Sequence, residues 1–341
     1  MLNRIALRVL ALAAMAAAFA AAGLTAYFGV LKPARSDAPA VKVAMTPERI
    51  ARGKYLFTLA DCDGCHTLRD WSRFGAPPIE TSRGRGFAMP PEMGMPGAIV
   101  APNITPDPET GIGRWTDGEK IRAIREGIRR DGSPLFPMMP YQFLRHMSDE
   151  DVQSLVAYLN TLAPIRNPLP RSAVDFPVSV LIRTAPQPAG SVPAPPRGDR
   201  LAYGRYLVAV AGCAECHTPA EKGRMDESRL FAGGHEFRLP GTRVISANIT
   251  PDADTGLGTW SEQEFLNRFY QYQEYVKNGA PPVGPEGVTV MPWLNLCQLP
   301  PEDLKAIYAF LRTVKPVFHS VDTHPGSPVT QSRPSFAAPK S

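Results

Sequence analysis

The pattern of apolar and polar residues predicts a mostly helical chain that begins with a long apolar segment. Residues 9–31 carry no charged side chain, and Arg4 and Arg8 precede them. A helix of this length spans about 34 Å, which is enough to cross the hydrocarbon core of a bilayer. Residues 1–35 are therefore interpreted as a membrane anchor or as a signal peptide that is cleaved among the alanines of residues 18–22. Both interpretations export the rest of the chain.

Shorter amphipathic helices are predicted beyond this segment. Thr46 and Pro47 are typical of a helix start, and the acidic cluster at residues 148–151 is typical of another, because acidic groups stabilise the positive end of a helix. Gly53 and Gly204 fall inside predicted helices, where glycine costs about 1 kcal/mol relative to alanine. We therefore expect two helices to approach each other closely at each of these glycines.

The chain also contains an internal duplication. Three pairs of segments share a sequence pattern: residues 52–66 and 203–217, 103–116 and 248–261, and 139–165 and 291–317. The members of these pairs lie 151, 145 and 152 residues apart, so the copies differ only by loop insertions. A duplicated unit of about 120 residues is the simplest explanation.

The duplication divides the chain into parts with different compositions. We expect one domain at residues 45–163 and a second at residues 199–317. Residues 164–198 contain nine prolines and are interpreted as a partly extended linker that lies over the domains. Residues 318–341 show no helical period and are expected to form an extended tail.

Composition and charge exclude several classes of protein. A chain that is 44% hydrophobic and 20% charged is neither intrinsically disordered nor a polytopic membrane protein. The formal net charge of +5 lies outside the repeats, because residues 45–163 carry a net charge of −1 and residues 199–317 one of −2. A nucleic-acid partner is therefore not expected.

The cysteines carry the most specific chemical signal. Four of the five lie in two Cys-x-x-Cys-His motifs, formed by Cys62, Cys65 and His66 and by Cys213, Cys216 and His217. This spacing is the attachment signature of c-type haem, because two thiols on one helical turn reach both vinyl-derived carbons of a porphyrin and the histidine is aimed at its iron. Two haem c groups are therefore predicted. Each macrocycle also supplies apolar core, which a chain with 37 prolines and 28 glycines lacks.

Zinc binding, dithiol redox chemistry and disulfide formation fit the cysteines less well. A zinc site usually combines two close pairs about 12–20 residues apart, whereas these pairs are 151 residues apart. A thioredoxin-like pair requires a βαβ context that the pattern does not show. Structural disulfides account neither for the histidine that follows each pair nor for its recurrence.

The repeat also indicates the second axial ligand of each iron. Met139 and Met291 occupy the same position in the two copies, 73 and 74 residues after the haem histidine, and each is followed by proline and an aromatic residue. A methionine ligand raises the reduction potential of a haem. Met138 is adjacent to Met139 and is the alternative in the first copy.

Four further residues recur between the copies as candidate contacts to the haem propionates: Trp115, Trp260, Asn103 and Asn248. An indole N–H or a side-chain amide can donate to a carboxylate. The structural alternative, a core tryptophan and a turn-forming asparagine, explains the recurrence equally well. Cys297 aligns with Arg145 and is interpreted as a lone buried thiol.

These motifs place the chain beside a known group of proteins. The segment 103–162, with NITPDPETGIGRWT, PMMPY and MSDEDVQSLVAYLNTL, resembles the cytochrome c subunits of bacterial membrane-associated alcohol, gluconate and sorbitol dehydrogenases. The resemblance covers both copies, about residues 45–317. Those subunits typically carry three haem motifs and a C-terminal membrane-associating segment, whereas this chain has two motifs and a polar tail.

The resemblance implies an all-α fold of two tandem class I cytochrome c domains on the periplasmic side of the bacterial inner membrane. It implies His66 and His217 as proximal ligands and Met139 and Met291 as distal ligands. It also implies electron transfer from a catalytic dehydrogenase subunit toward a quinone, another cytochrome or a terminal oxidase, with no catalytic residues in the chain itself. The alternative is a dihaem redox enzyme of the peroxidase or thiosulfate-oxidising type. That activity requires an open iron position or a cysteine ligand, for which Cys297 is the candidate.

The attachment chemistry can be tested by mass. We expect Cys65→Ser to abolish normal thioether attachment at the first motif and to leave the second haem in place, because each motif binds its own porphyrin. Intact-mass spectrometry of the purified chain measures the number of attached haems. A Cys65→Ser protein that still carries two haems would contradict the assignment.

Overall fold

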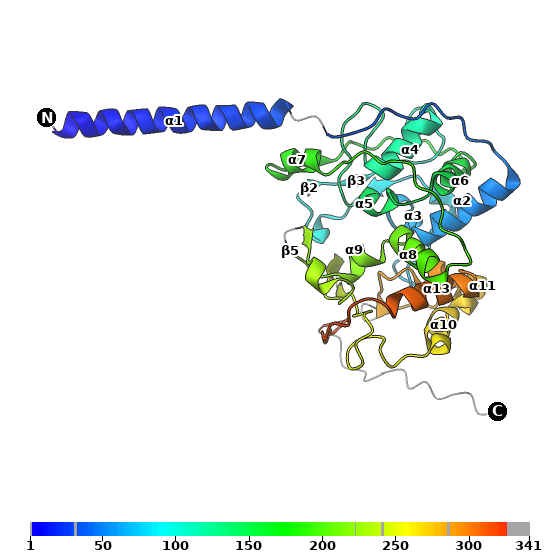
Figure 1. Ribbon diagram of the computed structural model, residues 1–341. Helices are drawn as coiled ribbons and strands as arrows, with labels where there is room; N and C mark the ends of the chain where they lie inside the picture. Colours follow the sequence, from blue (N-terminus) through cyan, green and yellow to red (C-terminus); the bar gives the residue numbers. More distant parts are fainter. Residues whose placement is uncertain (1, 31–32, 222, 240–241, 285–286, 326–341) are drawn as a thin grey trace, which may run out of the picture.

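The computed structural model describes residues 2–30, 33–221, 223–239, 242–284 and 287–325. Helix α1 (Leu2–Val30) projects away from a body that is built by the rest of the chain (Figure 1). Among the described residues, α1 is the one helix that is long and apolar enough to cross a membrane. Its segment Arg4–Ala26 has a mean hydropathy of 2.1, and none of it is buried against the body. This geometry fits both interpretations of the N-terminus, and a signal sequence passes the same test.

The two copies contain matching helices. The first copy is formed by α2 (Pro47–Leu59), α3 (Cys62–His66), α4 (Asp117–Glu126), α5 (Tyr141–Leu144) and α6 (Asp149–Leu159). The second is formed by α8 (Arg200–Val210), α9 (Cys213–His217), α10 (Glu262–Tyr270), α11 (Gln273–Asn278), α12 (Trp293–Leu296) and α13 (Pro301–Leu311). Helix α7 (Val178–Leu181) lies in the segment between them. Thr46 and Ser148 cap α2 and α6, because their hydroxyls accept hydrogen bonds from Arg49 N and Asp151 N.

Short antiparallel strand pairs accompany the helices, so the fold is mostly helical rather than all-α. The pairs are β1 (Phe87–Ala88) with β3 (Val100–Ala101), β2 (Gly97–Ala98) with β4 (Ala173–Val174), β5 (Ala220–Glu221) with β6 (Arg224–Met225), and β7 (Glu236–Leu239) with β8 (Thr242–Ile245). Single 3-10 turns lie at η1 (Glu80–Ser82), η2 (Pro91–Met93), η3 (Ile182–Thr184) and η4 (Glu227–Arg229). These elements shape the long loops between the helices, where the alternation of apolar residues is too short to show in the sequence.

The two glycines inside helices mark the crossings of the first and last helices of each copy, as the sequence predicted. A Cβ atom on Gly53 of α2 would lie 1.9 Å from the carbonyl oxygen of Ser154 in α6. A Cβ atom on Gly204 of α8 would lie 2.0 Å from the carbonyl oxygen of Ala306 in α13. Because no side chain fits at either position, the helices pack backbone against backbone, and this contact compensates for the low helix propensity of glycine.

The segment between the copies crosses the first copy in an extended conformation. The guanidinium of Arg125 donates to Gly190 O at 2.6 Å, and Arg145 donates to Pro188 O at 2.6 Å. Strand β4, which belongs to the same segment, pairs with β2. The beginning of the tail is held similarly in the second copy, where Ile245 N donates to Thr323 O at 3.0 Å. The remainder of the predicted tail, residues 326–341, lies outside the described residues.

The two copies pack against each other through equivalent surfaces. The hydroxyl of Tyr55 in α2 donates to Asp303 Oδ2 of the second copy at 2.5 Å. The hydroxyl of Tyr206 in α8 donates to Asp151 Oδ2 of the first copy at 2.5 Å. Tyr55 and Tyr206 are repeat equivalents, as are Asp151 and Asp303. A reciprocal pair of contacts is the signature of a two-fold arrangement, so the copies are related by a pseudo-two-fold axis.

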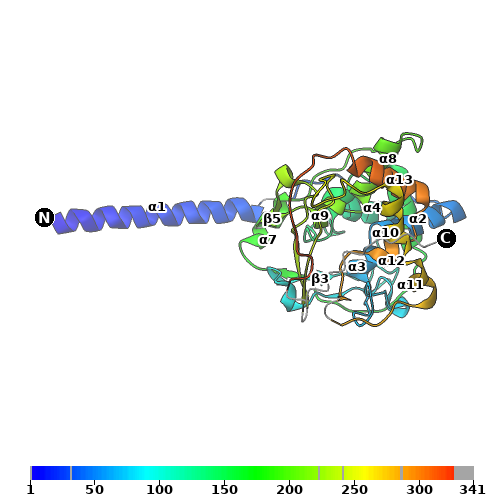
Figure 2. The same cartoon turned by 90° about the horizontal axis from the view of Figure 1, so that it is seen from below.

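The helix contacts across this interface are reciprocal as well. Helix α5 of the first copy contacts α8 of the second, and α12 of the second copy contacts α2 of the first. Helices α2 and α8 contact each other as well, and the view from below shows both copies in one body at the end of α1 (Figure 2). One further contact breaks the symmetry, because Asn295 donates to Asp61 Oδ1 at 2.8 Å while the equivalent positions hold phenylalanine and glycine.

The tyrosine–carboxylate contacts predict a stability effect. We expect Tyr206→Phe to lower the free energy of unfolding by about 1.5–3 kcal/mol, because a hydrogen bond to a charged group is lost inside the interface. Denaturant titration of the haem-loaded chain measures this change. Tyr275→Phe is the matched control, since Tyr275 is half-buried and its hydroxyl makes no hydrogen bond within the described residues. Equal midpoints for Tyr206→Phe and the control would contradict the role of the contact.

Candidate functional site

Each Cys-x-x-Cys-His motif forms a one-turn helix that follows a left-handed residue. Asp61 precedes α3 with φ 46°, and Gly212 precedes α9 with φ 64°. This conformation turns the chain sharply between the preceding long helix and the motif. Glycine adopts it freely, whereas in the first copy an aspartate does so and its carboxylate accepts the hydrogen bond from Asn295. The side chain at this turn therefore links the first motif to the second copy.

The two motif histidines are held in the same way. His66 Nδ1 lies 2.8 Å from Pro102 O, and His217 Nδ1 lies 2.8 Å from Ala247 O. A carbonyl can only accept, so Nδ1 carries the proton and Nε2 is left as the lone-pair donor. Burial lowers the pKa of both histidines. Both rings are therefore neutral imidazoles with fixed orientation, which is the state that binds iron.

The two candidate methionines also share their local geometry. The carbonyl of Met139 accepts a hydrogen bond from Tyr141 N at 2.7 Å, and that of Met291 accepts one from Trp293 N at 2.7 Å. Pro140 and Pro292 lie at the centres of these three-residue turns, with φ and ψ values near those of an inverse γ-turn. The turn fixes each methionine directly before a short helix.

His66 and Met139 line one cavity in the first copy. The cavity holds about 230 Å³, and most of its wall is apolar, with Ile112 and Leu159 among its lining side chains. Trp115 and Asn103 line it too. A neutral imidazole and a thioether that face an apolar space fit the needs of a haem with histidine and methionine ligands. In the second copy, His217 and Met291 make the matching local hydrogen bonds.

The recurrent asparagines stabilise the loop beside each site through side-chain hydrogen bonds. The side-chain amide of Asn103 donates to Thr110 Oγ1 at 3.1 Å and to Ile165 O at 2.7 Å. Asn248 repeats this with Thr255 Oγ1 at 3.0 Å and Val317 O at 2.8 Å. Both amide hydrogens of each residue are therefore engaged within the protein. These contacts support the turn-forming alternative.

The recurrent tryptophans are placed differently. Trp115 lines the cavity of the first copy and also a neighbouring hollow, so its ring separates apolar from charged surroundings. Trp260 is half-buried and packs against the hydrophobic core, and its carbonyl accepts a hydrogen bond from the Tyr308 hydroxyl at 2.7 Å. The structure therefore places Trp115 at the candidate site.

The environment of the thiols does not match that of a redox-active dithiol. Burial raises the pKa of Cys65 and of Cys213 to about 12 each, whereas reactive dithiols have lowered values. No group of three or more His, Cys, Asp or Glu side chains that could hold a metal ion lies within the described ranges. Cys297 is fully buried, its thiol donates to Leu294 O at 3.4 Å, and burial raises its pKa to about 11.

The charges of the two motifs interact across the interface. Desolvation raises the pKa of the Cys216 thiol, and the charges of Glu215, Cys213, Asp61 and Cys65 raise it further. Asp61 and Cys65 belong to the other copy, so the first motif lies within electrostatic reach of Cys216. Since these cysteines are the candidate attachment points, the covalently attached edges of the two haems would lie on either side of the interface.

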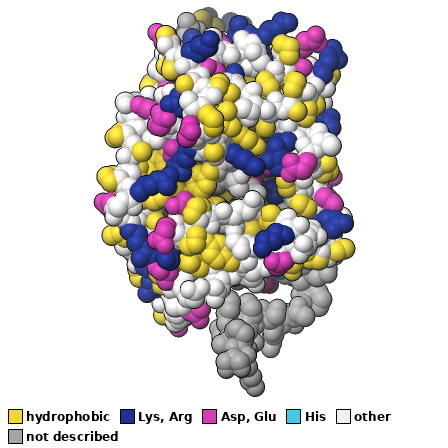
Figure 3. Space-filling model, turned by 90° about the vertical axis from the view of Figure 1, so that its right-hand side faces the viewer, with side chains coloured by type: hydrophobic (Ala, Val, Ile, Leu, Met, Phe, Trp, Pro, Cys, Tyr) yellow, Lys and Arg dark blue, Asp and Glu magenta, His cyan; other side chains and the backbone are white. Residues whose placement is uncertain are grey.

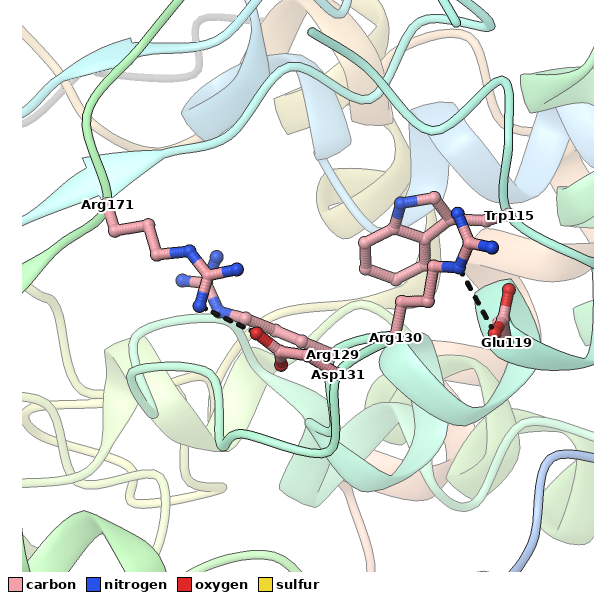
Figure 4. Close-up of a pocket in the computed structure, with 6 residues that line it drawn as sticks. All are labelled: Trp115, Glu119, Arg129, Arg130, Asp131 and Arg171. Carbon is pink, nitrogen blue, oxygen red and sulfur yellow. Dashed lines mark ion pairs between the residues drawn. The ribbon is translucent and has the colours of Figure 1, made fainter. Parts of the chain in front are cut away.

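A charged hollow adjoins the first cavity and contains residues that the sequence did not single out. It holds about 410 Å³ and is lined by Trp115, Glu119, Arg129, Arg130, Asp131 and Arg171 (Figure 4). Trp115, Arg129 and Arg171 line the apolar cavity as well. The sequence signal for this hollow is weak, since it consists of two arginines in the loop before Met139 and one in the linker.

Comparison with known proteins agrees with this geometry. The model of the family described as cytochrome c matches residues 50–163 and, separately, residues 201–315. The chain belongs to the cytochrome c family. The tandem arrangement of two cytochrome c domains, which the resemblance implied, is thereby confirmed.

Curated relatives of this cytochrome c chain carry related descriptions. It is 31% identical to the cytochrome c subunit of a quinone-type alcohol dehydrogenase from Gluconacetobacter polyoxogenes, over 84% of this chain and 61% of that protein. It is 34% identical to the cytochrome subunit of a fructose dehydrogenase from Gluconobacter japonicus, over 83% of this chain and 57% of that protein. It is 32% identical to a diheme cytochrome c-type protein from Cereibacter sphaeroides, over 83% of this chain and 91% of that protein. The chain spans about three fifths of the length of the first two relatives, and the prediction of two haem c groups is confirmed by the two domains and the dihaem relative.

The methionine assignment predicts a change in ligand binding. We expect Met139→Ala, and likewise Met291→Ala, to retain both covalent haems but to open one iron to small ligands such as imidazole, because the thioether at the cavity is removed. Spectral titration with imidazole measures the newly accessible iron. Met138→Leu is the matched control for the first copy and should bind no more imidazole than the unaltered chain. Unchanged binding in Met139→Ala would exclude it as a ligand.

Proposed function

We propose that this cytochrome c is the electron-transfer subunit of a dehydrogenase system and carries no catalytic residues of its own. The observation that supports this most directly is the placement of His66 and Met139 on one apolar cavity, with the same local bonds repeated at His217 and Met291. Two axial ligands saturate an iron and leave no position for substrate. The relatives described as subunits of alcohol, fructose and gluconate dehydrogenases supply the class of donor.

The chain's own residues have defined tasks in this function. Cys62, Cys65, Cys213 and Cys216 hold the two porphyrins, and Pro102 O and Ala247 O keep the two histidines in the iron-binding tautomer. When bound, each haem supplies a one-electron redox centre. The apolar walls exclude water from it, and the packed helices hold the ligands in place, so that little rearrangement accompanies a change of redox state.

Electron passage between the copies follows from the interface. Cys216 of one domain lies within electrostatic reach of Cys65 of the other, and the reciprocal tyrosine–carboxylate bonds fix the domains relative to each other. An electron that enters through one domain can therefore leave through the other without a domain movement. This makes the tandem chain a short relay rather than two independent carriers.

The partners and location are proposed on the same basis. A dehydrogenase subunit donates electrons, and a quinone, another cytochrome or a terminal oxidase accepts them. The domains occupy residues 45–163 and 199–317, joined by the linker at 164–198, and work on the periplasmic side of the bacterial inner membrane. Helix α1 anchors them there, since none of its apolar segment is buried against the body. The face turned away from α1 mixes basic, acidic and hydrophobic side chains (Figure 3), which suits contact with a protein surface of either charge.

Reduction by a partner tests this function. The full chain, with both haems and in detergent, is mixed with the dehydrogenase that copurifies with it and with the substrate of that enzyme. We expect both haems to become reduced during turnover, as followed in the visible spectrum, and no turnover by the cytochrome alone. A dihaem enzyme of the peroxidase or thiosulfate-oxidising type would instead show a high-spin component and turn over its substrate without a partner. That outcome would overturn the proposal.

A further inference from the structure

The charged hollow beside the first haem cavity contains two neighbouring arginines, one of which makes no ion pair with the described residues. Among the described residues, the side chain of Arg129 makes no hydrogen bond or ion pair. The two neighbouring arginines do form ion pairs, Arg171 with Asp131 at 2.6 Å and Arg130 with Glu119 at 3.5 Å. Burial lowers the pKa of Arg129 and the positive charge of Arg171 lowers it further, while the negative charge of Asp131 raises it. Two cations close together beside a partly enclosed space favour the binding of an anion.

The same two arginines form part of the wall of the apolar cavity. Arg129 and Arg171 line both the cavity that carries His66 and Met139 and the charged hollow. Figure 4 shows their guanidinium groups on one side of the hollow, next to Asp131, while Arg130 lies beside Trp115 and Glu119 on the other. A group that fills the apolar cavity and ends in carboxylates would place those carboxylates at this boundary. A haem has this character, with an apolar macrocycle and two propionates.

The second copy has no counterpart of this arginine pair. The loop before Met139, residues 127–138, contains Arg129 and Arg130, whereas residues 278–290 before Met291 contain no lysine or arginine. The linker and the tail correspond, because Asn167 N and His319 N donate to the equivalent Thr110 and Thr255 hydroxyls.

Arg171 lies four residues after Asn167 in the linker, and Thr323 lies four residues after His319 in the tail. Arg171 and Thr323 are therefore equivalent positions. Neither arginine therefore has a basic residue at the corresponding position of the second copy.

We propose that Arg129 and Arg171 bind the propionates of the first haem and give it a higher reduction potential than the second. This inference deepens the proposed function and rests on the assignment of His66 and Met139 to that haem. Reduction adds one negative charge to the haem, and a nearby cation stabilises the reduced state. The linker thus tunes the first redox centre through Arg171, and electrons pass from the second domain to the first, which is the domain next to α1.

A redox titration of the full, haem-loaded chain tests the proposal. We expect two midpoint potentials, and we expect Arg129→Gln to lower the higher one and leave the lower one in place. The shift should correspond to about a tenfold change in the redox equilibrium, which is 59 mV for a one-electron couple. Arg171→Gln should act in the same direction and less strongly, because Asp131 already offsets part of that charge. The component that changes its spectrum in Met139→Ala identifies the first haem.

Arg166→Gln is the matched control, since it removes the same charge from the same linker. Arg166 is as exposed as Arg171 and also pairs with a carboxylate, Glu109, at 2.8 Å, but it lines neither the cavity nor the hollow. It should move neither potential by a comparable amount. Equal shifts of both potentials in Arg129→Gln, a shift of the lower one alone, or no shift beyond the control would overturn the inference. If the chain has two low-spin haems and Arg129→Gln leaves both midpoint potentials unchanged, only this inference is contradicted. A chain without two low-spin haems would contradict the proposed function itself.

Discussion

The contact on which each domain depends is the crossing of its first and last helices at a glycine. Gly53 and Gly204 bring α2 onto α6 and α8 onto α13 with backbone almost touching backbone. Each motif follows the first helix of a pair directly, and each candidate methionine lies shortly before the second. The crossing therefore fixes the two helices that the histidine follows and the methionine precedes. A larger side chain at either glycine would separate the helices and with them the two ligands.

The second constraint is the reciprocal interface between the domains. Tyr55 and Tyr206 each reach a carboxylate on the last helix of the other domain, so the helices that cross at the glycines within each domain also form the interface. Ligand placement inside a domain and motif placement between domains are thus coupled through the same four helices. The chain needs no separate structure to align its two redox centres.

Much of this architecture could be predicted from the sequence, because the duplication acts as an internal alignment. The motif helices, the caps at Thr46 and Ser148, and the glycine crossings all follow from local patterns that the structure reproduces. The short strand pairs could not be predicted, since strands of two to four residues carry too little periodic signal. The Arg129–Arg171 pair was missed because it joins a loop to the linker, and only the folded chain brings these segments to one cavity.

The duplicated interface has a consequence for how such a protein can diverge. Two separate copies that met through this surface would be a symmetric dimer, whose halves must stay identical and whose assembly depends on concentration. Joining them through residues 164–198 makes the encounter intramolecular, so pairing persists at any dilution. Each half is then free to acquire its own substitutions. The first copy has Arg171 where the second has Thr323, and a difference of this kind can alter one redox centre without altering the other.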